Sequence, residues 1–330
     1  MVLGILMATL WPFHFFPTNN VEWLQSENGL RFHRDGVVIS TAYLNAPGAE
    51  AGNGCTLELM LRPASTESSG VILNFYSPDN PRRFQVRQWT DGLLVTHELP
   101  GPQNKLRKTK FDVDHAFQSG QLLLLTITSG QNSTVVYLNG RHAQSFPKFK
   151  ISCSEWTGRL AIGSSAVDYE PWQGEIYGLA IYPLEFSTEE VSRRDYSWSE
   201  GHAIRNVITP GPDLEIPKHF VIPVKAFLKS PGKEFEPSRD YLDDVLRNVA
   251  GFVPLGFLLG GYWGWGRARR QAVLYAILAG GMLSLVIEVL QAYIPQRNSG
   301  VTDIMTNTLG AALGALLAAV IFGRAKSSTE

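Results

Sequence analysis

Polar side chains recur at fixed spacing inside the apolar C-terminal part of the chain. The segment Asp244–Gly251 reads Asp-x3-Asn-x2-Gly, and Asp303–Gly310 repeats that pattern. The Asp and the Asn, four residues apart, share one face of a helix, and the Gly lets a second helix approach closely. We interpret the two copies as a parallel internal repeat of one helical unit, with two ordinary polar helix N-termini as the alternative.

A second group of polar side chains lies between the two copies. Ser284, Glu288 and Gln291 follow the spacing i, i+4, i+7 and therefore line one helix face. A carboxylate buried in a membrane costs on the order of 3 kcal/mol unless it is paired or protonated. We expect Glu288 to pair with Arg297 or with neighbouring amides, and to transfer protons, bind a headgroup or take part in catalysis. The alternative is that these groups only hold the helices together.

These patterns define a predicted polar site in the membrane, in which Glu288 and Asp303 are the catalytic candidates. Its members are Asp244, Asn248, Ser284, Glu288, Gln291, Arg297, Asp303 and Asn307. The chain contains no Gly-x-Ser-x-Gly nucleophile motif and no phosphate-binding loop, so enzymatic activity stays open. Its 7 histidines and 2 cysteines show no metal-ligand spacing, and we expect no metal and no other cofactor.

Three apolar segments are long enough to supply membrane-spanning helices: 249–265, 272–294 and 303–322. Their lengths approach the roughly 20 residues that cross a bilayer. Basic residues cluster after the first segment, within 266–270, and after the last. Because basic loops stay in the cytoplasm, we predict a cytoplasmic tail over 324–330 and an extracytoplasmic loop over 295–302. The polar site then lies near the outer leaflet.

The remaining segments flank this membrane domain, which we place at 242–323. Residues 1–16 are apolar and predict an N-terminal transmembrane helix whose beginning is absent, with a short interfacial hairpin as the alternative. Residues 196–241 are rich in proline and predict a juxtamembrane linker. One amphipathic piece of it, His219–Leu228, either lies on the membrane surface or is plain extended chain.

Residues 20–195 are polar, evenly charged and rich in short β-type runs. The predicted strands are 37–40, 56–61, 71–76, 84–89, 93–99, 122–128, 134–138, 160–162 and 175–182. The pairs Asp91-Gly92, Ser129-Gly130 and Asn139-Gly140 supply hairpin turns, because these residue types accept positive φ. We predict a two-part fold class, an all-β sandwich or jelly roll joined to a transmembrane bundle of about four helices.

Charge and composition exclude several classes of protein. Lys and Arg together number 29 and Asp and Glu 30, for a formal net charge of −1. That balance leaves no basic footprint for nucleic acid. A strand-rich polar part joined to an apolar helical part also excludes a simple cytosolic enzyme, a disordered chain and a coiled coil.

The ordered polar positions of the membrane part resemble the VanZ-like family. The resemblance covers 242–322 and rests on the two repeated segments, the Ser-x3-Glu-x2-Gln run, Arg297 and the sequence Gly251–Phe257. Ala8–Phe13 is similar to the end of that family's first span. The family is named for a protein that gives low-level teicoplanin resistance, so the resemblance implies a role in the cell-envelope or glycopeptide response. Many members carry a further Asp between the Arg and the Asp of the outer loop, in the region that Gly300 occupies here, and an activity that needs this Asp would be absent.

The β-rich part resembles a laminin-G or concanavalin A-like lectin domain over 29–191. The runs Gly70–Phe75, Leu122–Thr128, Thr134–Arg141 and Gly174–Val191 carry this resemblance. It implies loops that bind glycan or protein, and any calcium there would lack a recognisable motif. The Glu-x-Asp-x-Glu strand of the glucanase relatives is absent at Glu175, which favours a non-catalytic domain. The candidate ligand-binding aromatic residues are Trp89, Trp156, Tyr169 and Trp172, with core packing as the alternative for each.

The two cysteines, Cys55 and Cys153, lie far apart in the sequence. If the β-rich part lies outside the cytoplasm, an oxidising compartment allows them to form a disulfide. Two buried thiols are the alternative, and both stay open at this point.

Three functions follow from these expectations. The first is a multi-pass protein of the bacterial inner membrane, with an extracytoplasmic lectin-like domain that binds an envelope glycan or protein and a polar site among membrane lipids. The second is an intramembrane enzyme or lipid-headgroup handling protein that uses Glu288 and Asp303. The third is a passive membrane anchor for the β-sandwich.

Overall fold

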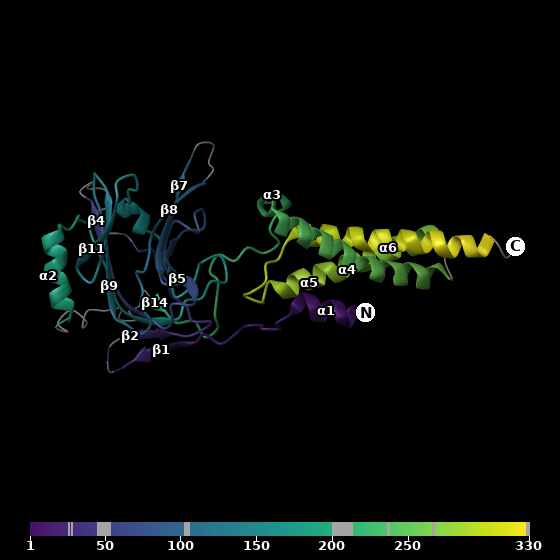
Figure 1. Ribbon diagram of the computed structural model, residues 1–330. Helices are drawn as coiled ribbons and strands as arrows, with labels where there is room; N and C mark the ends of the chain where they lie inside the picture. The colour runs from purple at the N-terminus through teal and green to yellow at the C-terminus, as the bar shows by residue number, and fades with distance from the viewer. Residues whose placement is uncertain are drawn as a thin grey trace. The chain divides into compact units, whose positions relative to one another are not determined.

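The computed structural model describes residues 1–25, 27, 29–44, 54–101, 106–199, 214–235, 238–265 and 268–327. The chain divides into two compact units, one formed by Pro17–Lys225 and the other by Met1–Phe16 with Ala226–Glu330. The first unit is built mainly of strands and the second of helices (Figure 1). The predicted two-part fold class is confirmed. Arg267 of the predicted basic loop, and Pro210 and Pro212 of the predicted linker, lie outside the described residues.

Two seven-stranded antiparallel sheets form the β unit. The first contains, in spatial order, β1 (Val21–Leu24), β2 (Gly29–Phe32), β13 (Gly174–Tyr182), β4 (Cys55–Pro63), β9 (Leu123–Ser129), β10 (Thr134–Leu138) and β11 (Arg141–Phe146). The second contains β14 (Leu214–Glu215), β3 (Val38–Ser40), β12 (Arg159–Ile162), β5 (Ser69–Tyr76), β6 (Phe84–Trp89), β7 (Gly92–Pro100) and β8 (Leu106–Val113).

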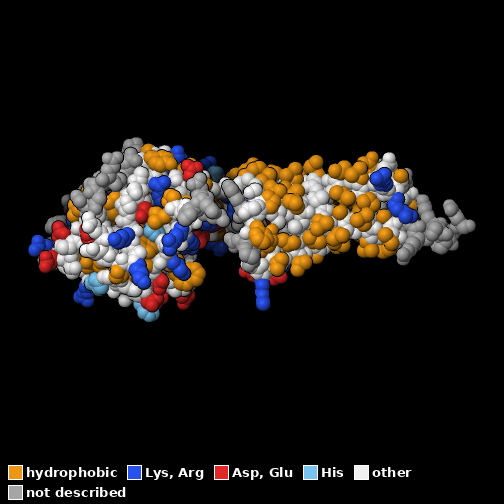
Figure 2. Space-filling view, turned by 90° about the horizontal axis from the view of Figure 1, so that it is seen from above, with side chains coloured by type: hydrophobic (Ala, Val, Ile, Leu, Met, Phe, Trp, Pro, Cys, Tyr) orange, Lys and Arg blue, Asp and Glu red, His pale blue; other side chains and the backbone are white. Residues whose placement is uncertain are grey.

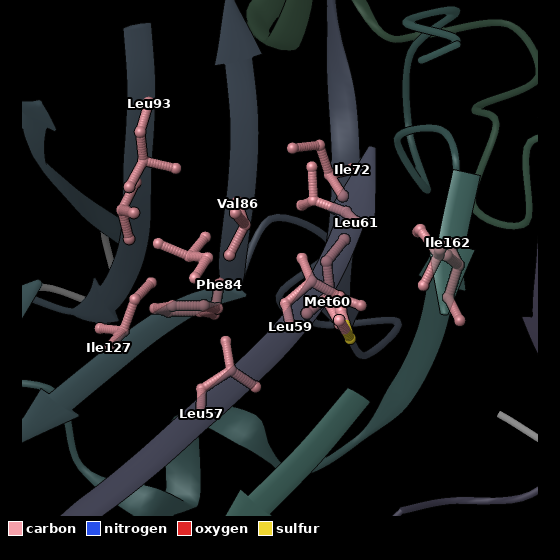
Figure 3. Packing of buried hydrophobic residues seen from close by; sticks show 14 of the residues in the cluster. Leu57, Leu59, Met60, Leu61, Ile72, Phe84, Val86, Leu93, Ile127 and Ile162 are labelled. Atoms are coloured by element: carbon pink, nitrogen blue, oxygen red, sulfur yellow. The ribbon is translucent and has the colours of Figure 1, made fainter. Parts of the chain in front are cut away.

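The core of this unit lies between the two sheets. Leu57 and Leu59 of β4 and Ile127 of β9 meet Phe84 and Val86 of β6, and all five side chains are buried (Figure 3). Alternate residues of a strand point to the same face, so each sheet presents one apolar face to the other. Burial of each such side chain contributes about 1.5–3 kcal/mol.

Of the three predicted turn pairs, only Asn139-Gly140 forms its turn as expected. The expected Ser129-Gly130 turn is wrong, because Ser129 is the last residue of β9, the connection to β10 is the longer loop 130–133, and neither residue has positive φ. Asn139 and Gly140 have φ of 50° and 72°, as a two-residue type I′ turn between β10 and β11 requires. Between β6 and β7 the loop is Thr90-Asp91, one residue before the predicted pair, and Thr90 has φ of 53°. The turn thus leaves Trp89 as the last residue of β6.

A helix covers part of the outer face of the first sheet. This helix, α2 (Thr188–Ser199), contacts β9 and β11. Its Arg194 donates from Nε to the carboxylate of Glu58 at 3.1 Å, and its guanidinium lies over the rings of Tyr182 and Phe186. Because Glu58 is fully buried on β4, this pairing offsets the cost of removing its charge from water.

Part of the predicted linker packs on the sandwich. Strand β14 pairs with β3, Phe220 is buried against the ring of Tyr169, and the Val224 amide donates to the Ala166 carbonyl at 2.8 Å. The piece 219–228 contains no helix and passes through a turn, in which the Lys225 amide donates to the Ile222 carbonyl at 3.1 Å. Its contact with a membrane surface stays a prediction.

Five helices form the helical unit among the described residues: α1 (Val2–Leu10), α3 (Pro231–Glu234), α4 (Arg239–Gly264), α5 (Arg269–Gln291) and α6 (Val301–Ser327). Within the same ranges α4, α5 and α6 are long and apolar enough to cross a membrane. Hydrophobic side chains cover much of this unit on the face that Figure 2 shows. The nine residues of α1 are shorter than a span needs, and α1 packs along α5 with Leu10 buried.

Helices α4 and α6 run parallel and touch through glycines. A Cβ placed on Gly310 would lie 2.2 Å from the Val249 carbonyl oxygen, and one on Gly314 would lie 1.9 Å from that of Val253. From α4, a Cβ on Gly256 would lie 1.9 Å from the Ala311 carbonyl oxygen. Such close approach of two backbones is the usual role of small residues in membrane helices. The predicted role of Gly251 is wrong, because a Cβ there would meet nothing within 4 Å.

Candidate functional site

Glu288 supplies the buried carboxylate of a polar cluster in the helical unit. Its side chain is 1% exposed, and it accepts a hydrogen bond from the Gly300 backbone amide at 2.7 Å. Gly300 directly precedes α6, so the carboxylate faces the positive end of that helix. The position of Glu288 on the buried face of α5, with Ser284 and Gln291, follows the spacing of the sequence.

The Gly300 amide is held in place by the backbone of a distant segment. The Lys229 amide donates to the Ser299 carbonyl at 3.0 Å, and the Val301 amide donates to the Lys229 carbonyl at 3.0 Å. These bonds form a parallel bridge between Lys229 and Gly300. The donor that meets Glu288 is therefore preorganised by main-chain atoms.

Amide and hydroxyl groups lie beside this carboxylate. Asn307 of α6 donates from Nδ2 to the Ser284 hydroxyl at 2.9 Å, and both side chains are buried. The Asn307 Oδ1 and the Ser299 hydroxyl are buried without a hydrogen-bond partner among the described residues. A buried polar atom without a partner costs about 1–3 kcal/mol. The Asn307 Oδ1 can therefore still accept a hydrogen bond, and the Ser299 hydroxyl can accept or donate one.

A further polar pair joins α4 to α6. Asn248 donates from Nδ2 to Asp303 Oδ1 at 2.7 Å. Each copy of the Asp-x3-Asn pattern thus contributes one residue to this bond, the Asn from the first and the Asp from the second. The structure brings both residues into the predicted site.

Two other predicted members of the site reach toward α1. Gln291 donates from Nε2 to the Thr9 carbonyl at 2.9 Å, and Arg297 donates from Nε to the Trp11 carbonyl at 3.0 Å. The expectation that Arg297 pairs with Glu288 is wrong. Thr9 and Trp11 lie at the C-terminal end of α1, where carbonyls are unpaired and a cation or amide donor is favoured.

Asp244 stands outside the cluster. Its side chain is 71% exposed and pairs only at 3.8 Å with Arg247, one turn along the same helix. Its expected place in the polar site is wrong, and the lengths of the helices explain why. Since α6 begins at Val301 and Asn248 already meets Asp303, the earlier turn of α4 that carries Asp244 has no turn of α6 beside it.

The candidate aromatic residues of the β unit divide into core and surface. Trp156 and Trp172 are 0% and 1% exposed, and the Trp172 indole donates to Gln88 Oε1 at 2.7 Å. Their expected role in ligand binding is wrong, because both rings fill the space between the sheets. The Tyr169 hydroxyl donates to the Asp35 carboxylate, so this side chain is also engaged. Trp89 remains, 60% exposed at the end of β6.

Polar residues follow Trp89 in the loop between β6 and β7. Asp91 of the adjoining loop pairs with His115, whose Nδ1 lies 2.5 Å from Asp91 Oδ2. The hydrogen bond to Asp91 raises the pKa of His115, and the same bond lowers the pKa of Asp91. An exposed indole beside hydrogen-bonding groups is an arrangement that suits the apolar face and the hydroxyls of a sugar.

Sequence reasoning missed a charged cluster on the first sheet. Glu175 of β13 accepts from Arg31 and Arg62, each at 2.7 Å, and from the Tyr177 hydroxyl. Burial acts to raise the pKa of Glu175, but the hydrogen bonds from Tyr177, Arg31 and Arg62 lower it below its usual range. A cleft of about 250 Å³ borders this cluster, with Gln173 in its lining. Arg31, Arg62 and Glu175 come from three strands that are far apart in the sequence. No local sequence pattern therefore indicates that these side chains meet.

Cys55 and Cys153 are both buried free thiols in the structure. The Cys153 thiol donates to the Gly54 carbonyl at 3.3 Å. Burial, followed by a hydrogen bond from Cys153, raises the pKa of Cys55 far above its usual range. The structure therefore corresponds to the thiol alternative. Within the described ranges no group of three or more His, Cys, Asp or Glu residues could hold a metal ion.

Two family models match the chain. The model described as VanZ/LLP1 matches residues 176–322, and the model described as the concanavalin A-like lectin/glucanases superfamily matches residues 34–192. Both resemblances seen in the sequence are confirmed. The VanZ-like match begins within β13 rather than at the expected residue 242, so the two matches overlap. The chain is a membrane protein that contains a domain of the concanavalin A-like type.

Similar solved structures share little sequence with the chain. The botulinum neurotoxin serotype D binding domain is 13% identical, with a TM-score of 0.38, and the match covers 55% of this chain and 45% of that one. A native heptameric SAP-like pentraxin from Limulus polyphemus is 16% identical, with a TM-score of 0.40, and the match covers 62% and 90%. This chain thus spans less than half the length of the neurotoxin domain. No curated protein matches the sequence.

Proposed function

Because this chain joins a VanZ-like helical region to a concanavalin A-like lectin domain, we propose that it is a bacterial cell-envelope membrane protein with two binding sites. The β unit lies outside the cytoplasm and binds an envelope glycan. The helical unit holds a polar ligand at the outer leaflet, around Glu288. The protein acts in the response of the envelope to glycopeptide-like stress.

One observation carries the helical part of this proposal. A passive anchor needs no carboxylate in its helices, yet Glu288 is buried there and bonds to the Gly300 amide. The hydroxyl of the preceding Ser299, and the Oδ1 of Asn307, which bonds to Ser284 one turn from Glu288, lack a partner among the described residues. A buried charge of this kind costs about 3 kcal/mol if nothing is gained from it. A bound ligand would explain why these three polar groups are present together. It could donate hydrogen bonds to the oxygens of Asn307 and Ser299 and a hydrogen bond or a proton to Glu288.

Complementation of a deletion strain tests this site. The variants Glu288→Gln and Asp303→Asn keep the shape of each side chain but remove the charge. We expect both to lose protection against glycopeptide while reaching the membrane at normal abundance. Asp244→Asn is the matched control, because Asp244 is exposed and outside the cluster. Full protection by all three variants would instead support the anchor function.

A second candidate function is the handling or chemical modification of a lipid headgroup, with Glu288 as acid or base. The pairing of Glu288 with a fixed backbone amide favours it, since a preorganised donor stabilises the ionised form. Lipid extracts of the strain with wild-type protein and with Glu288→Gln distinguish the two functions. A changed headgroup composition supports modification, and an unchanged composition with lost protection supports binding alone.

Glycan binding by the β unit depends on Trp89 in this proposal. The full chain in detergent, applied to an array of envelope glycans, should bind a sugar, and Trp89→Ala should weaken this binding by about tenfold. Tyr43→Ala is the control, because Tyr43 is another exposed aromatic residue of the same unit. If both variants lose the same amount of glycan binding, or if neither loses any, Trp89 is not part of the glycan site.

Sidedness is tested by a phosphatase reporter inserted after Glu200, together with a cytoplasmic fluorescent reporter in the same protein. Phosphatase activity would support an extracytoplasmic β unit and a polar site at the outer leaflet. A silent phosphatase in a stably inserted protein would place the β unit in the cytoplasm and reverse the argument from basic loops.

A further inference from the structure

A groove of about 660 Å³ lies at the end of the helical unit that is opposite to Glu288. It is formed by the last turns of α4, the first turn of α5 and the last apolar turns of α6. Since α5 begins at Arg269 in the groove and ends at Gln291 beside the polar site, the two regions are separated by the length of that helix.

Small residues create this groove. Gly264 and Ala319 lie in its walls, and a Cβ on Gly264 would meet nothing within 4 Å. The ring of Phe322 closes one side of the groove. Its centroid lies 5.7 Å from the centroid of the Phe257 ring. Three membrane helices therefore leave an apolar hollow where larger side chains would have filled the space.

The aromatic residues at the groove place it at the surface of the bilayer. Tyr262 and Trp265 line it, and their side chains are 74% and 86% exposed. Tyr and Trp concentrate where headgroups meet acyl chains, because the ring is apolar and its polar atom remains hydrated. A ligand in the groove therefore has its apolar part in the hydrocarbon layer and its polar end at the interface.

The charge at the groove selects the ligand. Arg269 lines it and is exposed, and no carboxylate of the described residues pairs with it. Arg270 follows, also exposed. A guanidinium presents a planar fork of donors that matches a phosphate group. This end of the helices is the one predicted to face the cytoplasm, where anionic lipids gather.

We propose that this groove binds one acyl chain of an anionic phospholipid, with Arg269 contacting the lipid phosphate. The acyl chain of the lipid lies along Gly264 and Ala319, and the glycerol backbone of the lipid lies near Tyr262 and Trp265. Binding at this site is independent of the polar cluster around Glu288.

Native mass spectrometry of the full chain in detergent tests the proposal. The protein is titrated with phosphatidylglycerol and with phosphatidylcholine of the same acyl chains. We expect one phosphatidylglycerol to be retained about tenfold more tightly than phosphatidylcholine, as a charge-assisted contact to phosphate implies. Equal retention of the two lipids would overturn the role of Arg269.

Matched glycine variants locate the bound lipid. Gly264→Phe fills the groove, whereas Gly251→Phe adds the same side chain to open space elsewhere on α4. We expect Gly264→Phe to lower phosphatidylglycerol retention by about tenfold or more and Gly251→Phe to leave it unchanged. Retention by Gly264→Phe at the wild-type level would overturn the proposal.

Arg269→Gln supplies a test that does not depend on packing, because this side chain is exposed. It should abolish the preference for phosphatidylglycerol while the melting temperature of the protein stays constant. A preference that survives Arg269→Gln overturns the proposal. A wild-type dimer that Gly264→Phe converts to a monomer would also overturn it, because a second copy of the chain would then occupy the groove.

Discussion

The two Asp-x3-Asn-x2-Gly segments share a sequence pattern but not an environment. In α6, Asp303 bonds to Asn248, Asn307 is buried against Ser284, and Gly310 touches the backbone of α4. In α4, Asp244 is exposed and Gly251 faces open space. The repeat therefore establishes two parallel helices without making them equivalent.

The third helix causes this difference. Helix α6 packs against both α4 and α5, and α5 supplies Ser284 to its Asn307. A Cβ on Gly280 of α5 would lie 2.4 Å from that of Ala311, so the approach on this side is also close. The second copy is enclosed by two neighbours, and the first presents one face to lipid. Packing, more than local pattern, decides which copy becomes a site.

The largest expected difference in stability is between substitutions at Gly310 and at Gly251. Gly310→Leu forces a side chain into the Val249 carbonyl, and we expect it to destabilise the helical unit by about 3 kcal/mol or more. Gly251→Leu should change stability by no more than about 0.5 kcal/mol. Thermal unfolding of the two variants in detergent measures the contrast, and equal melting temperatures would contradict it.

The two asparagines should differ by a smaller amount. Asn307→Ala removes a buried bond and leaves the Ser284 hydroxyl unmatched, at a cost of about 1–2 kcal/mol. Asn248→Ala affects a half-buried bond and should cost about 0.6 kcal/mol. Denaturant titration in mixed micelles gives both values. A larger loss from Asn248 would mean that the first copy is the more tightly enclosed.

A double-mutant cycle sharpens the comparison between the copies. Asn248→Ala and Asp303→Ala, alone and together, should give a coupling energy of about 0.6–1.7 kcal/mol, as for other hydrogen bonds between membrane helices. Additive losses would show that the bond at 2.7 Å makes no net contribution to stability.

The smallest effect is expected at the exposed pair of the first copy. Asp244→Ala and Arg247→Ala should couple by less than about 0.5 kcal/mol, because both side chains are exposed and their separation is 3.8 Å. High salt should abolish even that coupling. A coupling that persists in high salt would place Asp244 in a less hydrated setting than the structure gives it.

The sequence predicted most interior strands of the sandwich and missed all of its edge strands. β4, β5, β6 and β9 were expected from their apolar runs, whereas the interior strand β2 and the strands β1, β8, β11 and β14 were not. The last four are the edge strands of the two sheets. The sequence of β11, Arg-His-Ala-Gln-Ser-Phe, is almost wholly exposed, so it carries no apolar alternation to read. Edge strands are commonly polar because that discourages pairing with other chains.

The sequence predicted which side chains of the candidate site are buried on a helix face. It did not predict the contacts that depend on the path of a loop. Glu288 stood out as a charge in an apolar run, and its depth follows from helical spacing. Its partner did not follow, because the path of 295–300 sends Arg297 to α1 and aims the Gly300 amide at the carboxylate. Trp156 and Trp172 could not be separated from Trp89 by residue type, since only the assembled sheets show which rings are enclosed.

The bridge between Lys229 and Gly300 has a consequence for evolution. The donor to Glu288 and the bonds that orient it belong to the backbone, and any residue other than proline supplies the same amide. Positions 229 and 301 can therefore drift in sequence while the site keeps its shape, whereas position 299 also supplies the buried hydroxyl. Relatives that retain the carboxylate can therefore share the backbone donor and its supporting main-chain bonds. A comparison of side chains in the sequences would not detect this similarity.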